Sequence, residues 1–114
     1  MKITQRQRGG VTILDLEGRL SIGEGDIALR EAVLLLLDEG ESMILLNLRG
    51  VKSMDSSGLG ELVAGKTSAA ARGAHIKLLH LEDKVRHVVS MTQLIGIFES
   101  FDDELTAIAS FSKT

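Results

Sequence analysis

The stretch ILLNLRGVKSMDSSGLGELV, residues 44–63, decides which fold the sequence predicts. It opens inside an almost wholly apolar run, residues 43–48, which is typical of a strand covered on both faces. Its second part favours a helix over residues 57–72. Between the two, Asp55 or Ser56 suits the N-cap of that helix. A buried strand that leads into a helix is the building unit of an α/β fold.

The rest of the chain repeats this alternation of strands and helices. Gly9-Gly10 suits a hairpin turn between two strands. We expect strands at residues 2–7, 11–18, 75–81 and 97–101, and helices at residues 26–39, 82–94 and 102–111. These elements predict a single α/β domain, residues 1–114, with a central mixed sheet, its first two strands paired and its helices mainly on one face. The alternative is a doubly wound α/β domain, which needs helices over both faces.

Composition narrows the classes of function. A net charge of −3 gives no basic surface for nucleic acid. The longest apolar run, residues 32–37, is too short for a membrane span, which needs about 18 residues. The start MKITQRQRGG has no apolar segment after its charges, so no signal peptide is expected, and the chain contains no cysteine. We therefore expect a cytoplasmic protein without cofactors, nucleic acid or membrane contact.

The motif GELVAGKT matches a nucleotide-binding pattern, G-x-x-x-x-G-K-[ST], through Gly60, Gly65, Lys66 and Thr67. A phosphate-binding loop needs irregular backbone between a strand and a helix. Here the strand is expected to end near Leu48, and the residues between the two glycines all suit a helix. The residues expected on one face of this helix are Leu59, Leu62, Val63 and Ala70. We predict that the match is accidental and that Lys66 lays its stem along the sheet; a small P-loop NTPase is the alternative.

Two other groups of residues could carry chemistry. The three histidines are not spaced to meet on one face, so we expect no metal site from His75, His80 and His87. Glu82 and Asp83 could be paired catalytic acids, but they stand where helix-starting acids belong. We predict a structural place for all five.

The helix expected at residues 26–39 carries more leucines than one face can hold. At about 100° per residue, its core stripe contains Leu29, Ala32, Val33 and Leu36. Leu34 and Leu35 point away from this stripe. We expect a wide groove to bury one of the two. For the other leucine the sequence leaves two alternatives, burial or an exposed apolar patch. Such a patch would serve a partner or self-association as a weak homodimer.

The serines after Asp55 admit two interpretations. Ser56 and Ser57 can simply cap the helix, with Gly58 and Gly60 letting the backbone be approached closely. A serine at a helix N-terminus is also a good phosphate acceptor, because free N–H groups and the positive end of the helix dipole stabilise the added charge. The residues alone leave both interpretations open.

Several motifs together point to one family. They are LEGRL at residues 16–20, LREAV and LLDEG in the helix expected at 26–39, and VRHVVSMTQLIGIFESFDDEL at 85–105. The most specific is DSSGLG, residues 55–60, which follows an apolar strand and the pair Gly50-Val51. Over almost its whole length the chain resembles the STAS domains, specifically the bacterial anti-sigma-factor antagonists. In similar proteins the first serine after the aspartate is phosphorylated, which implies Ser56 here.

The resemblance implies a STAS fold and a phosphorylation switch. An unphosphorylated antagonist binds an anti-sigma factor that is also a serine kinase, and so releases a sigma factor for transcription. Phosphorylation by that kinase ends binding until a metal-dependent serine phosphatase restores it. The chain is then a binding protein with no active site of its own. Its implied partner-binding residues are Asp55, Ser56, Ser57, Gly58, Ser21 and Glu24.

One loop departs from the family pattern. Family members often carry an aspartate three residues after the glycine that closes the second strand. This chain has Ser21 in that place, with Glu24 and Asp26 slightly later. We therefore expect this loop to contact its partner differently. An alternative role within the family is a STAS scaffold subunit of a stress-signalling assembly, which this serine does not switch.

Overall fold

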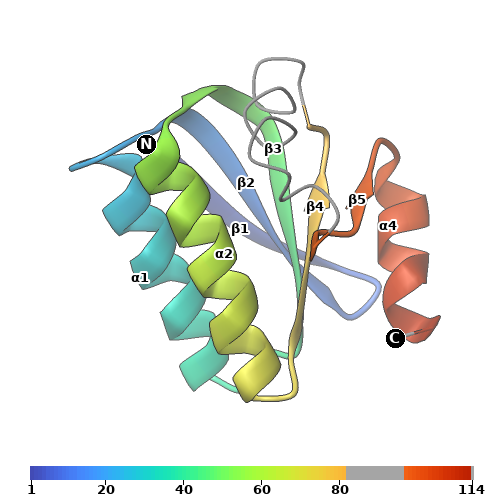
Figure 1. The fold of residues 1–114 in the computed structure, drawn as a ribbon. Coiled ribbons are helices and arrows are strands. Elements are labelled where there is room, and N and C mark those ends of the chain that lie inside the picture. The colour runs from blue at the N-terminus through green and yellow to red at the C-terminus, as the bar shows by residue number, and fades with distance from the viewer. Residues whose placement is uncertain (82–96, 114) are drawn as a thin grey trace.

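A computed structural model describes residues 1–81 and 97–113 of the chain (Figure 1). The elements of this part, in chain order, are β1 (Lys2–Arg8), β2 (Val11–Leu20), α1 (Gly25–Asp38), β3 (Met43–Met54), α2 (Ser56–Ala71), β4 (His75–Leu79), β5 (Ser100–Phe101), α4 (Glu104–Ser110) and the short 3-10 helix η2 (Phe111–Lys113). The helix expected at residues 82–94 lies outside the described residues.

The strands form one sheet in the order β1-β2-β3-β4-β5. β1 and β2 are antiparallel and are joined at Gly9-Gly10, where both glycines have positive φ angles of 58° and 80°. Left-handed backbone at both turn positions suits glycine and matches the twist of the two strands. The other neighbouring strands are parallel. The predicted mixed sheet with a first hairpin is therefore confirmed.

β2 and β3 are longer than the sequence predicts, reaching Leu20 and Met54. Their parallel pairing contains two register irregularities. Gly50 lies close to one of them, and a Cβ on it would come within 2.6 Å of the Leu16 carbonyl oxygen. Bulges interrupt the alternation of inward and outward side chains. Residues 49–54 therefore carry no strand pattern, although they continue β3.

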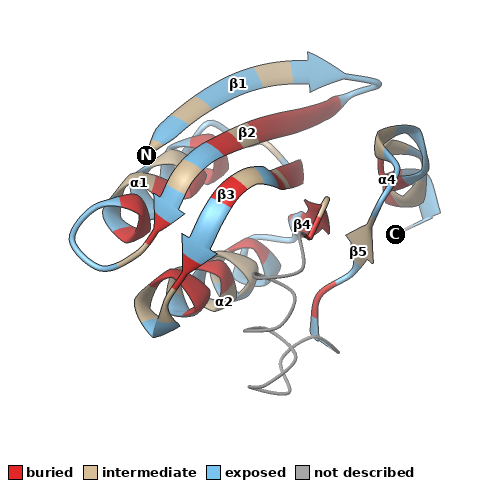
Figure 2. Cartoon of the chain, turned by 90° about the horizontal axis from the view of Figure 1, so that it is seen from above, coloured by how far each residue is buried: buried red, intermediate tan, exposed pale blue. Residues whose placement is uncertain are grey.

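The two faces of the sheet carry separate apolar clusters (Figure 2). α1 and α2 lie side by side over one face, where the largest fully buried side chains include Leu14, Leu16, Leu29, Leu36, Ile44, Leu46, Leu62 and Leu78. α4 and η2 cover part of the opposite face through a smaller cluster made of Val11, Ile13, Leu45, Leu79, Ala107 and Phe111. Among the described helices, two of the three α-helices thus share a face, as predicted.

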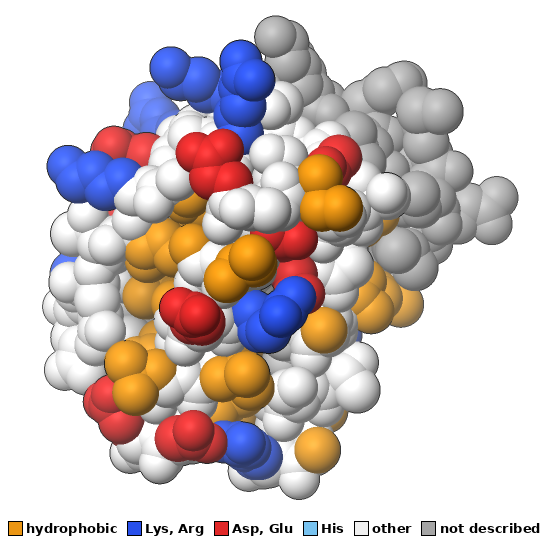
Figure 3. All heavy atoms as spheres, turned by 90° about the vertical axis from the view of Figure 1, so that its left-hand side faces the viewer, with side chains coloured by type: hydrophobic (Ala, Val, Ile, Leu, Met, Phe, Trp, Pro, Cys, Tyr) orange, Lys and Arg blue, Asp and Glu red, His pale blue; other side chains and the backbone are white. Residues whose placement is uncertain are grey.

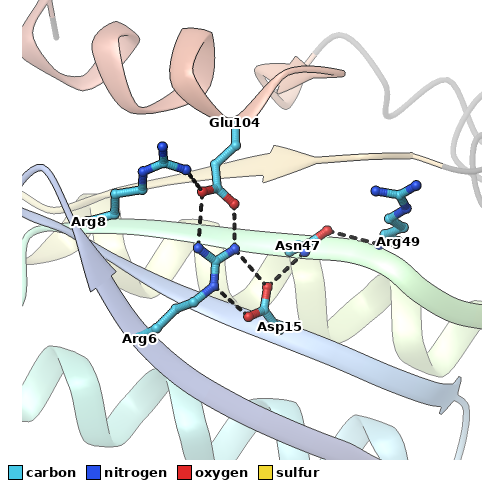
Figure 4. Close-up of polar contacts among 6 residues, drawn as sticks. All are labelled: Arg6, Arg8, Asp15, Asn47, Arg49 and Glu104. Carbon is cyan, nitrogen blue, oxygen red and sulfur yellow. Dashed lines mark hydrogen bonds and ion pairs between the residues drawn. The ribbon is translucent and has the colours of Figure 1, made fainter.

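Salt bridges hold α4 against the sheet. Arg6 on β1 lies between Asp15 on β2 and Glu104 at the start of α4 (Figure 4). Its Nε donates to Asp15 Oδ2 at 2.6 Å, and its Nη1 donates to Glu104 Oε2 at 3.0 Å. Arg8 Nη1 approaches the same Oε2 at 2.5 Å, and Asn47 Nδ2 donates to Asp15 Oδ1 at 2.8 Å. This network links three strands to α4.

The network predicts a specific loss of stability in acid. The hydrogen bond from Arg6 lowers the pKa of Glu104 from 4.5 to about 2. The stability that comes from ionised Glu104 is therefore complete above pH 4.5 and is lost as the pH falls toward 2. Because Arg6 is partly exposed, we expect Glu104→Gln to cost only about 1 kcal/mol at pH 7.

Urea unfolding of wild type and Glu104→Gln at several pH values measures this contribution. The two free energies of unfolding should converge as the pH falls below 4.5. A constant gap between the two proteins across that range would contradict the assignment.

Candidate functional site

The ends of β2 and β3 lie side by side, immediately before α2 begins. Leu20 pairs with Met54 in the parallel register, and the Asp55 N–H donates to the Leu20 carbonyl oxygen at 3.3 Å. The β2–α1 loop, residues 21–24, begins at this same end of the strands. The sheet therefore brings this loop to the start of α2, although the two are more than thirty residues apart in the sequence.

The Asp55 carboxylate joins the loop to the helix. Its Oδ1 accepts from the Gly58 N–H at 2.9 Å, so Asp55 is the N-cap of α2, and its Oδ2 accepts from the Ile22 N–H at 3.0 Å. These bonds, first from Gly58 and then from Ile22, hold the pKa of Asp55 below its usual range. Because the folded pKa is lowered, this contribution to stability is present near neutral pH and is lost in acid. The sequence left the N-cap open between Asp55 and Ser56, and the bond to the loop was missed.

Replacing Asp55 should loosen both segments at once. We expect Asp55→Ala to lower the free energy of unfolding by about 1 kcal/mol, because the N-cap is lost. Amide hydrogen exchange at Ile22 should also become faster, because its acceptor is gone. Asp103→Ala is a matched control, since Asp103 caps α4 by accepting from the Thr106 N–H at 2.8 Å, at a distance from this loop. Unchanged exchange at Ile22 in Asp55→Ala would contradict the proposed link.

Two glycines let the helix N-termini pack directly on the end of β2. A Cβ on Gly58 would lie 2.0 Å from the Leu20 carbonyl oxygen, and a Cβ on Gly25 would lie 2.2 Å from the Arg19 carbonyl oxygen. The close approach predicted at Gly58 is thus confirmed, but the one predicted at Gly60 is wrong, because a Cβ there meets no atom of the described residues within 4 Å. Gly25 was missed, although a glycine directly before the expected helix start is a readable sign. α1 and α2 both begin against the backbone of one strand end.

The two serines differ in exposure. Ser56 is the first residue of α2 and is exposed, whereas Ser57 is half-buried. A modifying enzyme therefore reaches the side chain of Ser56 more readily. The assignment of phosphorylation to Ser56 stays a prediction. The exposed position of Ser56 at the start of α2 is compatible with this assignment.

The β2–α1 loop presents its side chains outward. The Ser21 carbonyl oxygen accepts from the Asp26 N–H at 3.2 Å, which closes the loop onto the start of α1. Glu24 is exposed, with its carboxylate 3.5 Å from the N-terminal ammonium group. Ile22 is 73% exposed, more than any other large hydrophobic side chain among the described residues. The loop that contains Ser21 and Glu24 thus reaches Asp55 through the N–H of Ile22, which was not predicted.

The nucleotide-binding pattern lies inside a continuous helix. β3 runs to Met54 rather than ending near Leu48, so Asp55 alone separates it from α2 and no loop is present. Gly60 and Gly65 are helical, and Thr67 Oγ1 donates to the Val63 carbonyl oxygen at 3.0 Å within the helix. The predicted helix through the motif is confirmed.

The buried face of α2 is slightly rotated from the predicted one. Leu59 and Leu62 are buried and Val63 is half-buried, but Ala70 is exposed and Ala69 is buried in its place. Lys66 is half-buried and, with His75 and Glu99, lines a hollow beside β4.

The prediction that a groove buries Leu34 or Leu35 is wrong. Leu34 is 36% exposed and Leu35 is 59% exposed. α1 contacts the rest of the molecule on one side, so the two leucines project at opposite rims. Leu34 lines a hollow between α1 and α2, and Leu35 lines one between α1 and β1. The face that contains α1 shows hydrophobic side chains scattered between charged ones (Figure 3).

A cluster of metal-ligating side chains and a helix that could span a membrane are both absent among the described residues. In residues 1–81 and 97–113, no group of three or more His, Asp or Glu side chains could hold a metal ion. His75 is exposed and His80 is half-buried. No helix in this part of the chain has the length and apolar character to cross a membrane. His87, Glu82 and Asp83 lie outside the described residues.

Comparisons with known proteins indicate one family. A family model described as "Mlab, STAS domain" matches residues 3–99. A relative from Paenibacillus polymyxa, named anti-sigma F factor antagonist, is 24% identical over 108 residues, which cover 95% of this chain and 92% of that protein.

Solved structures share the fold. A Thermotoga maritima protein assigned as an anti-sigma factor antagonist has a TM-score of 0.87 and 28% identity, covering 95% of this chain and 92% of that one. The Bacillus cell fate determinant SpoIIAA in its phosphorylated form has a TM-score of 0.73 and 20% identity, covering 96% of this chain and 99% of that one. A structure of the anti-sigma factor antagonist SpoIIAA in its unphosphorylated form has a TM-score of 0.72 and 16% identity, covering 98% of each chain.

Proposed function

Because the chain belongs to the STAS domain family, we propose that it is an anti-sigma-factor antagonist whose binding is switched off by phosphorylation of Ser56. One observation carries the proposal. Ser56 is exposed at the first residue of α2, and Asp55 fixes both this helix start and the adjacent β2–α1 loop. A small neutral hydroxyl thus lies at a helix start that one carboxylate joins to a neighbouring loop.

The proposed switch acts on the interface and leaves the fold intact. A phosphate on Ser56 adds nearly two negative charges at the positive end of the α2 dipole, which offsets repulsion from Asp55. A partner surface that fits a neutral hydroxyl would have to desolvate this dianion without a matching cation. An intact fold is supported by solved SpoIIAA structures, because one in the phosphorylated form and one in the unphosphorylated form both share the fold of this chain.

The partners of the proposed cycle follow from this assignment. The unphosphorylated chain binds an anti-sigma factor that is also a serine kinase, in the cytoplasm, and thereby releases a sigma factor for transcription. A metal-dependent serine phosphatase returns the phosphorylated chain to the binding state. The chain itself is a binding protein and a phosphate acceptor, and it catalyses no step. The exposed Leu34 and Leu35 support a weak homodimer through α1.

Calorimetric titration with a candidate anti-sigma factor tests the proposal. The partner to use is the purified serine kinase encoded nearest to the gene of this chain, with ADP present so that no phosphate is transferred. We expect saturable binding with one chain per kinase subunit. Absence of heat and of co-elution would overturn the proposed function. Binding that Ser56→Asp leaves unchanged would instead favour an unswitched STAS scaffold.

A further inference from the structure

Gly60 has no evident role in holding the chain together. It lies inside α2, where glycine is less favourable than alanine because it leaves the unfolded chain more freedom. Its φ angle is not positive, so the backbone does not demand a glycine there. A Cβ built on Gly60 meets no atom within 4 Å. Within the described residues, nothing packs where its side chain would be.

The other glycines of α2 face the interior of the molecule. A Cβ on Gly58 would collide with the Leu20 carbonyl oxygen. A Cβ on Gly65 would make ordinary contacts at 3.6 Å with Ile76 Cδ1 and Val33 Cγ1. Gly60 is the one whose missing side chain faces outward.

Gly60 also shares its face of α2 with Ser56. Residues four apart in a helix lie above one another, so Gly60 sits one turn further along from the proposed phosphate acceptor. Both residues are exposed. The backbone of Gly60, which carries no side chain, therefore lies one turn from the Ser56 hydroxyl. A partner that covers Ser56 can also contact Gly60.

Ile22 adds an independent feature beside the same helix start. Its side chain is 73% exposed, and its N–H donates to the Asp55 carboxylate at 3.0 Å, which holds the loop backbone beside the start of α2. Burying an exposed apolar side chain at an interface contributes favourable free energy to binding, in proportion to the apolar area removed from water. Ile22 stands at the position next to Ser21, where the loop departs from the family pattern.

We propose that Gly60 and Ile22 set the specificity of the Ser56 surface for its anti-sigma factor. The partner packs directly on the α2 backbone at Gly60 and buries Ile22 in an apolar pocket of its own. This inference rests on the proposed function and names two residues through which the partner recognises the chain.

Titration of the same anti-sigma factor with matched variants tests each residue. Gly60→Ala should unfold at higher urea concentration than wild type, yet bind about tenfold more weakly, because a methyl group separates the closely packed surfaces. Gly65→Ala is the control, since it adds the same methyl group to the same helix but toward the interior.

Ile22→Ser should also lose about tenfold in affinity. Its control is Leu105→Ser, because Leu105 is 59% exposed on α4, on the opposite face.

The outcomes separate this inference from the proposed function. If wild type binds and Gly60→Ala binds equally well or better, Gly60 is not a contact and its part of the proposal is overturned. Wild-type affinity in Ile22→Ser overturns the part played by Ile22 in the same way. If wild type does not bind, the proposed function itself fails.

Discussion

Replacing Gly58 with alanine is expected to destabilise the chain by about 3 kcal/mol or more. The added Cβ would lie 2.0 Å from the carbonyl oxygen and 2.8 Å from the carbonyl carbon of Leu20, so backbone rather than a flexible side chain must move. Moving α2 away from β2 would also stretch the bond between the Asp55 N–H and Leu20. Urea unfolding at pH 7, followed by circular dichroism, measures the loss.

Gly60→Ala is the matched control for this prediction. The same change, two residues later in the same helix, meets no atom within 4 Å and should stabilise the chain by up to about 1 kcal/mol. The two alanine variants should therefore shift the unfolding midpoint in opposite directions. A Gly58→Ala protein with the wild-type midpoint would contradict the packing described at the end of β2.

Local signals in the sequence predicted the elements that depend on near neighbours. The glycine pair at residues 9–10 marked the first hairpin, and the pair Asp55-Ser56 marked the start of α2. The apolar runs identified the central strands, because side chains buried on both faces leave a continuous pattern. From these elements, the mixed sheet and helices mainly on one face followed. The DSSGLG motif located the candidate site.

Features that depend on contacts between distant segments could not be predicted. β3 extends through residues 49–54 because β2 pairs with it around bulges, which leave no period in the sequence. The bond from Ile22 to Asp55 depends on two strand ends that meet only in the folded sheet. The network of Arg6 and Glu104 likewise joins opposite ends of the chain. The exposure of Leu34 and Leu35 depends on how much of the α1 surface packs against the sheet and α2, which the sequence of α1 does not specify.

The largest expected effect on binding comes from Ser56. Ser56→Ala should bind the anti-sigma factor constitutively and should accept no phosphate from its kinase. Ser56→Asp should stay folded, because a carboxylate at a helix N-terminus is well tolerated. It should bind about a hundredfold more weakly, because the partner must desolvate a charge where it fits a hydroxyl. Ser57→Ala is the matched control, and it should still accept phosphate and be switched by it.

Phosphopeptide mapping of the chain after incubation with the cognate kinase and ATP, together with titration of the purified phosphorylated form, tests the central claim most directly. We predict a single phosphate on Ser56 and the loss of measurable binding, with the circular dichroism spectrum unchanged. Phosphate on Ser57, no phosphate on this turn, or full affinity of the phosphorylated chain would contradict a switch at Ser56.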